Sequence, residues 1–582
     1  MSGSELSKEQ LAALDHGVAL LEACPGSGKT RTIVQRFKKL ASTASKGIAL
    51  LSFTNAAVDE ASTRCRDQPQ ILKSPNFVGT FDSFIHRYIV TPAIAPTLGK
   101  APTYLESWSS LPMPTTLHAR NKPGGGVELS SFQHDKLGRI FLDVSTLNRT
   151  QRSYFNGLET DDDRESLESR GIRMIQGLNK KGIFDCDSAR ARALAILRSD
   201  QGPSVLSRLS DRFQEVMVDE FQDCSSLEHE IIKLLSSVGI QTLVVADPDQ
   251  AIYEFRGATA AIYDEYRLLV PGDSRRVLVD NYRSSPAICT LLTSVRTGRQ
   301  SVVSVGSFVD ETPASIFLIV GVPADIGTKF SAIAEEWKID ADERIALAYS
   351  ATDSQKLGSG IGKAPGGAAL TTRILRDMGI LRQKGSPSVR RKAISGLETT
   401  ILSLLEWPDE LTNEDNKTKL AHLGLDSRWL RLVIGRLIRE SEEWTDSPSC
   451  KSSLVTVLGQ ELSSLGVGFG TSTLKQKMSR IFPDAWTFWS ESKSSGVDKS
   501  KLQWSTIHGA KGNEYDAVLL NIPDKAAENA WTLDAALEDK RVFYVGASRA
   551  RRVLAIATPK TRLKGLKSNL DSFGVPYEVV YC

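Results

Sequence analysis

The stretch LEACPGSGKTRTIVQRF, residues 21–37, runs from an apolar, strand-like end through a glycine loop into an amphipathic helix, which is the context that a P-loop requires. Gly26 and Gly28 allow backbone N–H groups to close around phosphate oxygens at a helix N-terminus, where the helix dipole favours anions. Lys29 is placed to reach the β- and γ-phosphates, and the Thr30 hydroxyl to bind Mg²⁺. A chance glycine turn is the alternative, but the strand before and the helix after it favour a nucleotide site.

A second acidic site lies in EVMVDEFQD, residues 215–223, where a strand-like run ends in adjacent carboxylates. Asp219 is expected to hold Mg²⁺, directly or through water, and Glu220 to polarise the water that attacks the γ-phosphate. An exposed acidic loop is the alternative for an isolated pair of this kind. Because a P-loop precedes it in the same chain, we interpret this segment as a Walker B element.

Strand-like apolar runs alternate with helical periods along the chain, as in βα units on a mostly parallel sheet. Nine runs are predicted to be strands: 18–23, 48–53, 215–218, 242–246, 277–279, 316–320, 345–349, 517–520 and 553–557. The stretches from roughly 90 to 205 and from roughly 350 to 500 differ in character, with glycine-rich loops and charged helical segments. The sequence therefore predicts at least two α/β domains, each with an insertion.

Composition limits the possibilities without choosing among them. The 582 residues are 41% hydrophobic and 24% charged, enough for about four ordinary domains. No apolar run approaches the ~18 residues that cross a bilayer and no secretory signal is evident, so we expect a cytoplasmic protein without a membrane partner. Seven widely spaced cysteines without a CxxC pair argue against a structural metal cluster. A net charge of +3 leaves a nucleic-acid partner open.

The P-loop and DEFQD, residues 219–223, resemble motifs of the UvrD/Rep/PcrA family of superfamily 1 DNA helicases. Further motifs of that family follow in its order: LSKEQ (6–10), SFTNAA (52–57), GTFDSF (79–84), DPDQAIYEFRGA (247–258), DNYRSS (280–285), TIHGAKGNEY (506–515) and YVGASRA (544–550). The resemblance implies an α/β fold with two RecA-like parallel-sheet domains, 1A and 2A, and mainly helical insertions, 1B and 2B. The expected boundaries are 1–89 and 206–272 for 1A, 90–205 for 1B, 273–352 and 499–582 for 2A, and 353–498 for 2B.

The same resemblance assigns roles around ATP. The catalytic residues would be Lys29, Glu220, the γ-phosphate sensor Gln250, and two arginine fingers from the second domain, Arg283 and Arg549. The nucleotide-binding residues would be Gln10, Pro25, Gly26, Ser27, Gly28, Lys29, Thr30, Arg31, Tyr282, Arg283, Glu514 and Arg549. Within this set Gln10 would bind the adenine edge, Tyr282 and Arg31 its faces, and Glu514 would lie near the ribose. A surface salt bridge is the alternative role for each arginine.

Aromatic faces and cations hold single strands without reading sequence. The residues expected to contact DNA are Phe53, Thr54, Thr80, Phe81, Tyr253, Phe255, Arg256, Thr506 and His508. Core packing is an equally good interpretation for Phe53 and Phe81. His508 is interpreted as a strand contact or network residue, because no other His or Cys lies near it in the sequence.

The resemblance implies an ATP- and Mg²⁺-dependent 3′→5′ helicase or translocase on single-stranded or partly duplex DNA, acting in repair, recombination or phage defence. Three positions depart from the family pattern: Asp82 stands where relatives commonly carry histidine, Phe255 where they carry tryptophan, and Ala56 where they carry lysine. The 2B insertion also lacks an obvious copy of the glycine-aromatic signature with which housekeeping relatives grip duplex DNA. The nucleotide site is therefore intact, whereas the DNA contacts are altered.

The alternative function is an ATPase subunit of a nuclease complex that senses DNA or a partner and unwinds little. ACPGSGKT (23–30) and TFDSFIHRYIV (80–90) resemble compact UvrD-like proteins that accompany nucleases in anti-phage systems such as Gabija. A P-loop small-molecule kinase is disfavoured, because it would need neither two arginine fingers nor a strand-binding track.

Overall fold

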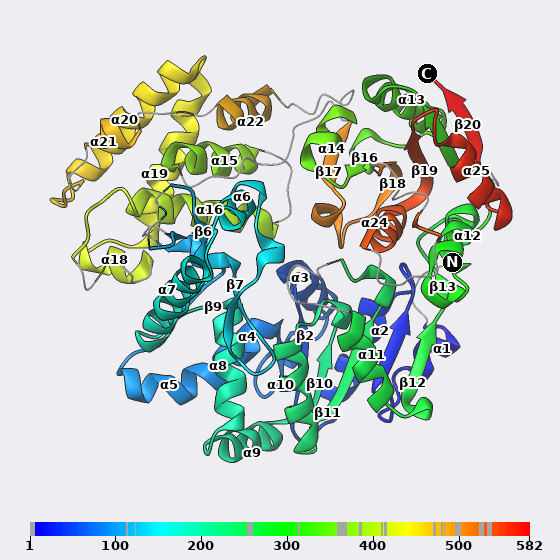
Figure 1. Cartoon of the computed structure of the whole chain (residues 1–582), viewed down its shortest axis with the longest axis horizontal. Coiled ribbons are helices and arrows are strands. Elements are labelled where there is room, and N and C mark those ends of the chain that lie inside the picture. The colour runs from blue at the N-terminus through cyan, green and yellow to red at the C-terminus, as the bar shows by residue number, and fades with distance from the viewer. Residues whose placement is uncertain are drawn as a thin grey trace.

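The computed structural model describes residues 6–111, 115–120, 122, 124–252, 260–311, 315–357, 369–382, 387–408, 411, 416–469, 473–478, 481, 483–494, 502–522, 529–531 and 538–582. Two six-stranded, fully parallel sheets organise this part of the chain, and an insertion extends from each (Figure 1). The α/β fold with two RecA-like domains is therefore confirmed.

The first sheet has the strand order β12-β1-β11-β10-β2-β3. Its strands are β1 (Leu20–Ala23), β2 (Gly47–Ser52), β3 (Phe77–Thr80), β10 (Phe213–Val218), β11 (Gln241–Ala246) and β12 (Arg275–Leu278). Every residue of β1 and β2 is buried, as expected for parallel strands covered on both faces. One face packs against α2 (Lys29–Ala41) and α3 (Asn55–Arg64), and the other against α8 (Cys186–Arg198), α9 (Gly202–Arg212) and α10 (Ser226–Ser237).

The second sheet has the order β17-β16-β18-β19-β15-β20. Its strands are β15 (Ile316–Val320), β16 (Arg344–Ala348), β17 (Gln503–Thr506), β18 (Tyr515–Asn521), β19 (Ala550–Thr558) and β20 (Glu578–Tyr581). One face packs on α12 (Pro286–Val295), α24 (Glu538–Ala547) and α25 (Leu563–Ser572), the other on α13 (Pro323–Glu336) and α14 (Ala351–Leu357).

One expected boundary needs correction. The division at residue 273 assigns β12 to the second domain, but β12 pairs in parallel with β1 along its whole length, from Leu20 opposite Arg275 to Ala23 opposite Leu278. The strand begins with two arginines and lies at the sheet edge, so it lacks the continuous apolar run that marks a buried strand.

The first insertion combines helices with short strand pairs. Its helices are α5 (Thr91–Leu98), α6 (Arg149–Asn156) and α7 (Asp161–Lys180). Its strand pairs are β4 (Thr103–Leu105) with β9 (Ile183–Asp185), β5 (Thr116–Leu117) with β6 (Val127–Glu128), and β7 (Phe132–His134) with β8 (Ile140–Leu142). The helix α8, which follows β9, packs into the core of the first RecA-like domain.

The second insertion is helical throughout its described residues. Its helices are α15 (Leu370–Arg382), α16 (Pro387–Leu402), α18 (Asn416–His422), α19 (Ser427–Glu440), α20 (Ser447–Ser463), α21 (Leu474–Lys477) and α22 (Pro483–Ser494). A core of leucines with Trp444 and Trp489 joins them. Across the described parts of the chain, no helix has the length and apolar character needed to span a membrane.

Candidate nucleotide site between the two sheets

The P-loop connects β1 to α2, as predicted. Gly26 and Gly28 both adopt left-handed backbone angles, with φ of +70° and +76°. A Cβ at Gly26 would lie 2.6 Å from the Cβ of Arg283, so a side chain would collide with the second predicted nucleotide element. Gly28 caps α2 without a side-chain hydrogen bond, which keeps the first-turn N–H groups suited to an anion.

Gln10 supports the loop from outside. Its Nε2 donates to the Ser27 carbonyl at 2.9 Å, and the Ser27 hydroxyl donates to the Cys24 carbonyl at 2.7 Å. Gln10 also closes a capping box with Ser7 on α1 (Lys8–Ala12). The described contact of Gln10 is thus with the P-loop backbone, and its adenine contact stays a prediction.

Thr30 and Asp219 lie together at the end of β10. The Thr30 hydroxyl donates to Asp219 Oδ2 at 3.4 Å. Burial and the negative charge of the neighbouring Glu220 raise the pKa of Asp219. A hydroxyl beside a buried carboxylate is an oxygen donor set that Mg²⁺ accepts, so these two predicted ligands fit the ion.

The pKa of Glu220 is shifted in the opposite direction, below its ordinary value. Burial opposes ionisation of its carboxyl, but Lys29, Lys511 and Arg549 outweigh this effect and lower the pKa of Glu220. Its backbone has a left-handed φ of +56°, a conformation that non-glycine residues rarely adopt and that is concentrated at functional sites. Glu220 is therefore held as an anion, the form that can orient and activate a water molecule.

Arg549 comes from the second domain and contacts the predicted γ-phosphate sensor of the first. Its Nη2 donates to Gln250 Oε1 at 3.0 Å, and its Nε donates to the Val545 carbonyl at 3.0 Å. Gln250 in turn donates through Nε2 to Asp247 Oδ2 at 2.7 Å. Burial, together with the nearby Arg283, lowers the pKa of Arg549 to about 10, so the guanidinium stays protonated at neutral pH.

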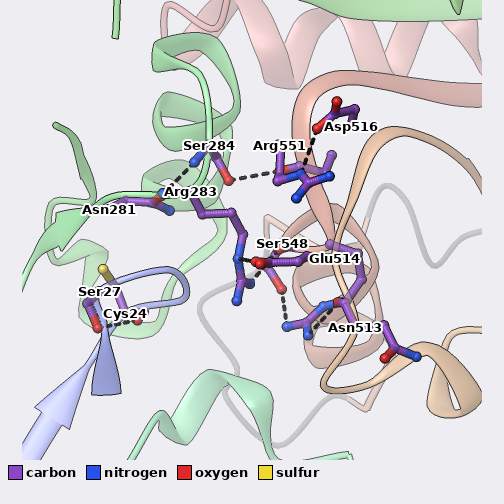
Figure 2. A network of polar contacts seen from close by, with 12 residues as sticks. Cys24, Ser27, Asn281, Arg283, Ser284, Asn513, Glu514, Asp516, Ser548 and Arg551 are labelled. Carbon is purple, nitrogen blue, oxygen red and sulfur yellow. Dashed lines mark hydrogen bonds and ion pairs between the residues drawn. The ribbon is translucent and has the colours of Figure 1, made fainter. Parts of the chain in front are cut away.

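Arg283 extends between the P-loop side and the second domain (Figure 2). Its Nη1 donates to the Ser548 carbonyl at 3.0 Å, and its Nε forms an ion pair with Glu514. The neighbouring Tyr282 is 39% exposed, and its backbone N–H donates to the Gly26 carbonyl at 2.9 Å. Arg31 lies half-buried in the first turns of α2. The predicted nucleotide residues of both domains thus gather around one loop.

Two residues of this site were absent from the sequence-based set. Lys511 donates to both carboxylate oxygens of Asp223, at 2.8 and 2.6 Å, and to the Gln250 carbonyl at 3.0 Å. Asn281 is fully buried, and its Oδ1 accepts the backbone N–H groups of Arg283 and Ser284, each at 2.7 Å. Both lie inside recognised motifs, but nothing in the residue types alone separates these roles from surface positions.

Only some of the residues predicted to contact single-stranded DNA are accessible to it. Phe53 and Phe81 stack with ring centroids 6.0 Å apart, but Phe81 is 1% exposed within the first core. Its role as a DNA contact therefore needs correction, because a buried ring offers no face to a base. The hydroxyls of Thr54 and Thr80 accept N-cap hydrogen bonds on α3 and on α4 (Phe81–Ile85).

The second-domain part of the track lies at the interface. The Thr506 hydroxyl accepts from the Gly509 N–H at 3.0 Å, and His508 Nε2 lies 3.2 Å from the Ile252 carbonyl oxygen. Burial lowers the pKa of His508. Tyr253, Phe255 and Arg256 fall outside the described residues, as does the side chain of Ala56.

Asp82, which departs from the family pattern, is held in an ion network. Arg190 of α8 donates to its two carboxylate oxygens at 2.8 and 2.9 Å, and Arg190 Nε also lies 2.9 Å from Glu228 Oε1. The Arg190 guanidinium holds the pKa of Asp82 below its usual range, although burial acts in the other direction. The Asp82 carboxylate is therefore engaged by Arg190 within the first domain.

Outside this site, one group of side chains among the described residues is close enough together to bind a metal ion: His229, Glu230 and Glu265. Lys233 pairs with both glutamates, at 2.7 and 3.3 Å, so their charge is already balanced by the protein.

A P-loop in one parallel-sheet domain, approached by arginines from a second, defines the class of P-loop proteins with two RecA-like domains. The chain belongs to the UvrD-like family of superfamily 1 DNA helicases. Residues 6–268 match the UvrD/REP helicase N-terminal domain and residues 460–561 the UvrD-like helicase C-terminal domain.

Individual relatives agree with this placement. DNA helicase II of Haemophilus influenzae is 28% identical over 297 residues, and that of Escherichia coli is 26% identical over 293 residues. Each alignment covers 49% of this chain and 39% of the relative, so the chain matches well under half the length of each of these two relatives. The ATP-dependent DNA helicase srs2 of Schizosaccharomyces pombe is 25% identical over 50% of this chain and 34% of its own length.

Proposed function

We propose that this protein is an ATP- and Mg²⁺-dependent DNA helicase or translocase that moves 3′→5′ on single-stranded DNA. The observation that carries the proposal is the contact between Arg549 of the second domain and Gln250 of the first, beside the P-loop. A nucleotide hydrolase that needs only one domain would have no use for this contact. Family membership supports the substrate class. The polarity is what the resemblance of the motifs implies.

In this proposal the nucleotide is held between the two sheets. The first-turn N–H groups of α2 and Lys29 bind the phosphates, and Thr30 with Asp219 holds Mg²⁺, which supplies charge neutralisation at the phosphates when bound. Glu220, held as an anion, orients the attacking water. Arg283 and Arg549 neutralise charge on the γ-phosphate from the second domain, so hydrolysis depends on domain closure.

Three second-domain residues hold the short segment 250–252 that leads into the predicted strand contacts at 253–256. Arg549 binds the Gln250 side chain, Lys511 the Gln250 carbonyl, and His508 approaches the Ile252 carbonyl. A change in domain closure would therefore displace this segment. This supports a motor in which nucleotide state controls the grip on single-stranded DNA.

The direct test is the variant Lys29→Ala. We expect it to fold and to lose ATP hydrolysis stimulated by single-stranded DNA, because the β- and γ-phosphates lose their cation. Hydrolysis at the wild-type rate in this variant would refute the site. A second variant, Lys39→Ala, changes an exposed lysine at the far end of the same helix and serves as the matched control.

An ATPase that senses DNA or a nuclease partner and unwinds little is the second candidate. The burial of Phe81 and the use of Asp82 in an internal ion network favour it, because both remove groups from the strand track. A strand-displacement assay beside an ATPase assay separates the two functions. Robust DNA-stimulated hydrolysis without displacement would favour the sensor, and a nuclease gene beside this gene would favour a role in phage defence over repair or recombination.

A further inference from the structure

A buried arginine that lies outside the family motifs joins the second domain to the segment that carries Gln250. Arg296 directly follows α12 of the second domain, and Asp249 belongs to the first. Both side chains are buried, and Arg296 Nε lies 3.3 Å from Asp249 Oδ2. The backbone N–H of Thr297 donates to Asp249 Oδ1 at 2.9 Å. The second domain therefore holds both carboxylate oxygens of Asp249.

Asp249 is linked in turn to the residue that orients Gln250. Asp247 caps the short 3₁₀ helix that ends in Gln250, and its Oδ1 accepts the Asp249 N–H at 3.3 Å. Asp247 Oδ2 accepts from Gln250 Nε2 at 2.7 Å and from the Tyr544 hydroxyl of the second domain at 3.3 Å. The Gln250 amide is therefore held through both of its polar atoms, the nitrogen by Asp247 and the oxygen by Arg549.

The positive charge of Arg296 also acts on Asp247. Asp247 is fully buried, and burial raises the pKa of its carboxyl. The charges of Lys29 and Arg296 oppose this rise, so one cation from each domain favours the carboxylate form that accepts from Gln250. Separation of the two domains would remove the contribution of Arg296.

Arg296 is not arranged like an arginine that serves packing alone. Its Nη1 is buried and, among the described residues, has no hydrogen-bond partner. Arg344, another buried arginine of the second domain, donates to the carbonyl oxygens of Ile339 and Ser331 at 2.8 and 3.3 Å. Buried polar groups that support a fold are normally satisfied in this way. The placement of Arg296 instead follows the carboxylates of the first domain.

We propose that Arg296 is a positioning residue for the γ-phosphate sensor Gln250 when the two domains are closed. It acts through the carboxylates of Asp249 and Asp247. The inference rests on the proposed function, to which it adds a residue from outside the motifs. Within the described part of the chain, Arg296 forms no hydrogen bond or ion pair with a residue predicted to bind ATP, so it should affect the rate of hydrolysis and not the binding of the nucleotide.

The test is the variant Arg296→Gln in ATP hydrolysis stimulated by single-stranded DNA. We expect kcat to fall by about tenfold to a hundredfold, because misplacement of a catalytic side chain can cost this much. KM for ATP should stay within about twofold of wild type. Arg296→Lys keeps the charge and should recover part of the lost kcat, although it lacks the planar guanidinium. A kcat of Arg296→Gln within about twofold of wild type would overturn the proposal.

Arg344→Gln is the matched control, because it removes a buried arginine of the same domain from contacts within that domain. Thermal unfolding of both variants identifies a temperature at which each is folded, and the kinetics are measured there. Arg344→Gln should leave kcat close to the wild-type value. An equal loss of kcat in both variants would overturn the proposal, since general destabilisation would then explain the defect.

The double variant Asp249→Asn/Arg296→Gln tests the route through Asp249. If Arg296 acts through this carboxylate, kcat of the double variant should be no lower than that of Arg296→Gln alone. A kcat lowered by the product of the two single defects would overturn this route. Wild-type protein without DNA-stimulated hydrolysis would refute the proposed function, whereas stimulated hydrolysis that Arg296→Gln leaves unchanged would refute the positioning role alone.

Discussion

Lys511 and Asp223 form a buried ion pair that joins the two parallel-sheet domains. The Lys511 ammonium lies 2.8 and 2.6 Å from the two Asp223 carboxylate oxygens, and the side chains are only 9% and 5% exposed. The same ammonium also favours ionisation of Glu220. The pair therefore links the position of the second domain to the charge state of the acidic site.

Lys511→Gln should lower the kcat of DNA-stimulated ATP hydrolysis by about tenfold to a hundredfold, which corresponds to about 1.4 to 3 kcal/mol in the activation barrier. Removing Lys511 takes away the ammonium that contacts both oxygens of the buried Asp223 carboxylate, and breaking a buried pair on one side costs more than the pair itself contributes. Steady-state kinetics with saturating single-stranded DNA measures the loss.

The double variant Lys511→Gln/Asp223→Asn tests the reason. If an uncompensated carboxylate causes the defect, replacing both partners with neutral groups should restore part of the lost kcat. A double variant whose defect equals the product of the single defects would show that the two residues act separately.

Asn281 is expected to act as a positioning residue for Arg283. Its Oδ1 accepts the N–H groups of Arg283 and Ser284, and its oxygen lies where a Gly26 side chain would be, 2.7 Å from the ideal Cβ position. Asn281→Ala removes the acceptor and should lower kcat by about tenfold, since a loss of about 1.4 kcal/mol in orientation is enough for that.

Asn281→Asp separates orientation from general destabilisation. An aspartate oxygen can accept the same two N–H groups, so the turn is kept and kcat should recover relative to Asn281→Ala, while the added charge beside the P-loop should raise KM for ATP. If both variants lower kcat equally with unchanged KM, Asn281 does not act through this turn.

All nine runs predicted as strands are strands of the two large sheets. Eight of them lie inside a sheet, where parallel strands covered on both faces carry uninterrupted apolar sequence; the ninth is the edge strand β12. The missed strands β3, β17 and β20 are short, and they lie at sheet edges. β17 has one exposed and three partly buried residues, so neither an apolar run nor a clean alternation marks it. The sequence therefore predicts the central strands of each sheet more reliably than the edge strands.

The residues of the candidate site likewise fall into those that the sequence predicts and those that it does not. Backbone-driven features such as Gly26 and Gly28 are visible in the sequence, because only glycine tolerates their angles and the close approach of Arg283. The burial of Phe81 and the Lys511–Asp223 pair depend on which elements fold together over long separations. Local sequence does not encode that information.

The network around Arg190 makes a stability prediction. Among the described residues, Asp82→Asn leaves Arg190 with Glu228 as its counterion, so we expect the free energy of unfolding of the first domain to fall by about 2 to 3 kcal/mol. Urea unfolding followed by fluorescence measures this. Glu60→Gln, which breaks the exposed Arg64–Glu60 pair, should change it by about 0.5 kcal/mol or less. Equal effects of the two substitutions would contradict the structural role of Asp82.

His86 should give the stability of this region a pH dependence. It begins a π-helix, His86–Val90, between α4 and α5. Its ring stacks on that of Tyr104, with the ring centroids 3.6 Å apart. Burial lowers its pKa to about 4; Asp82 opposes this shift and Arg190 adds to it. Below the ordinary pKa of about 6.5, the unfolded chain binds the proton more readily than the folded chain. The contribution of neutral His86 to the free energy of unfolding is therefore fully present above pH 6.5, and it is lost as the pH falls to about 4.

His86→Phe keeps an aromatic ring against Tyr104 but cannot titrate. Between pH 7 and pH 4, wild type should lose on the order of 1 to 2 kcal/mol more than this variant, a figure reduced for the partial exposure of the histidine. His422→Gln, at an exposed position on α18, should follow wild type across the same range. If the His86→Phe and wild-type stability profiles stay parallel from pH 7 to pH 4, the buried histidine is not the group that sets this dependence.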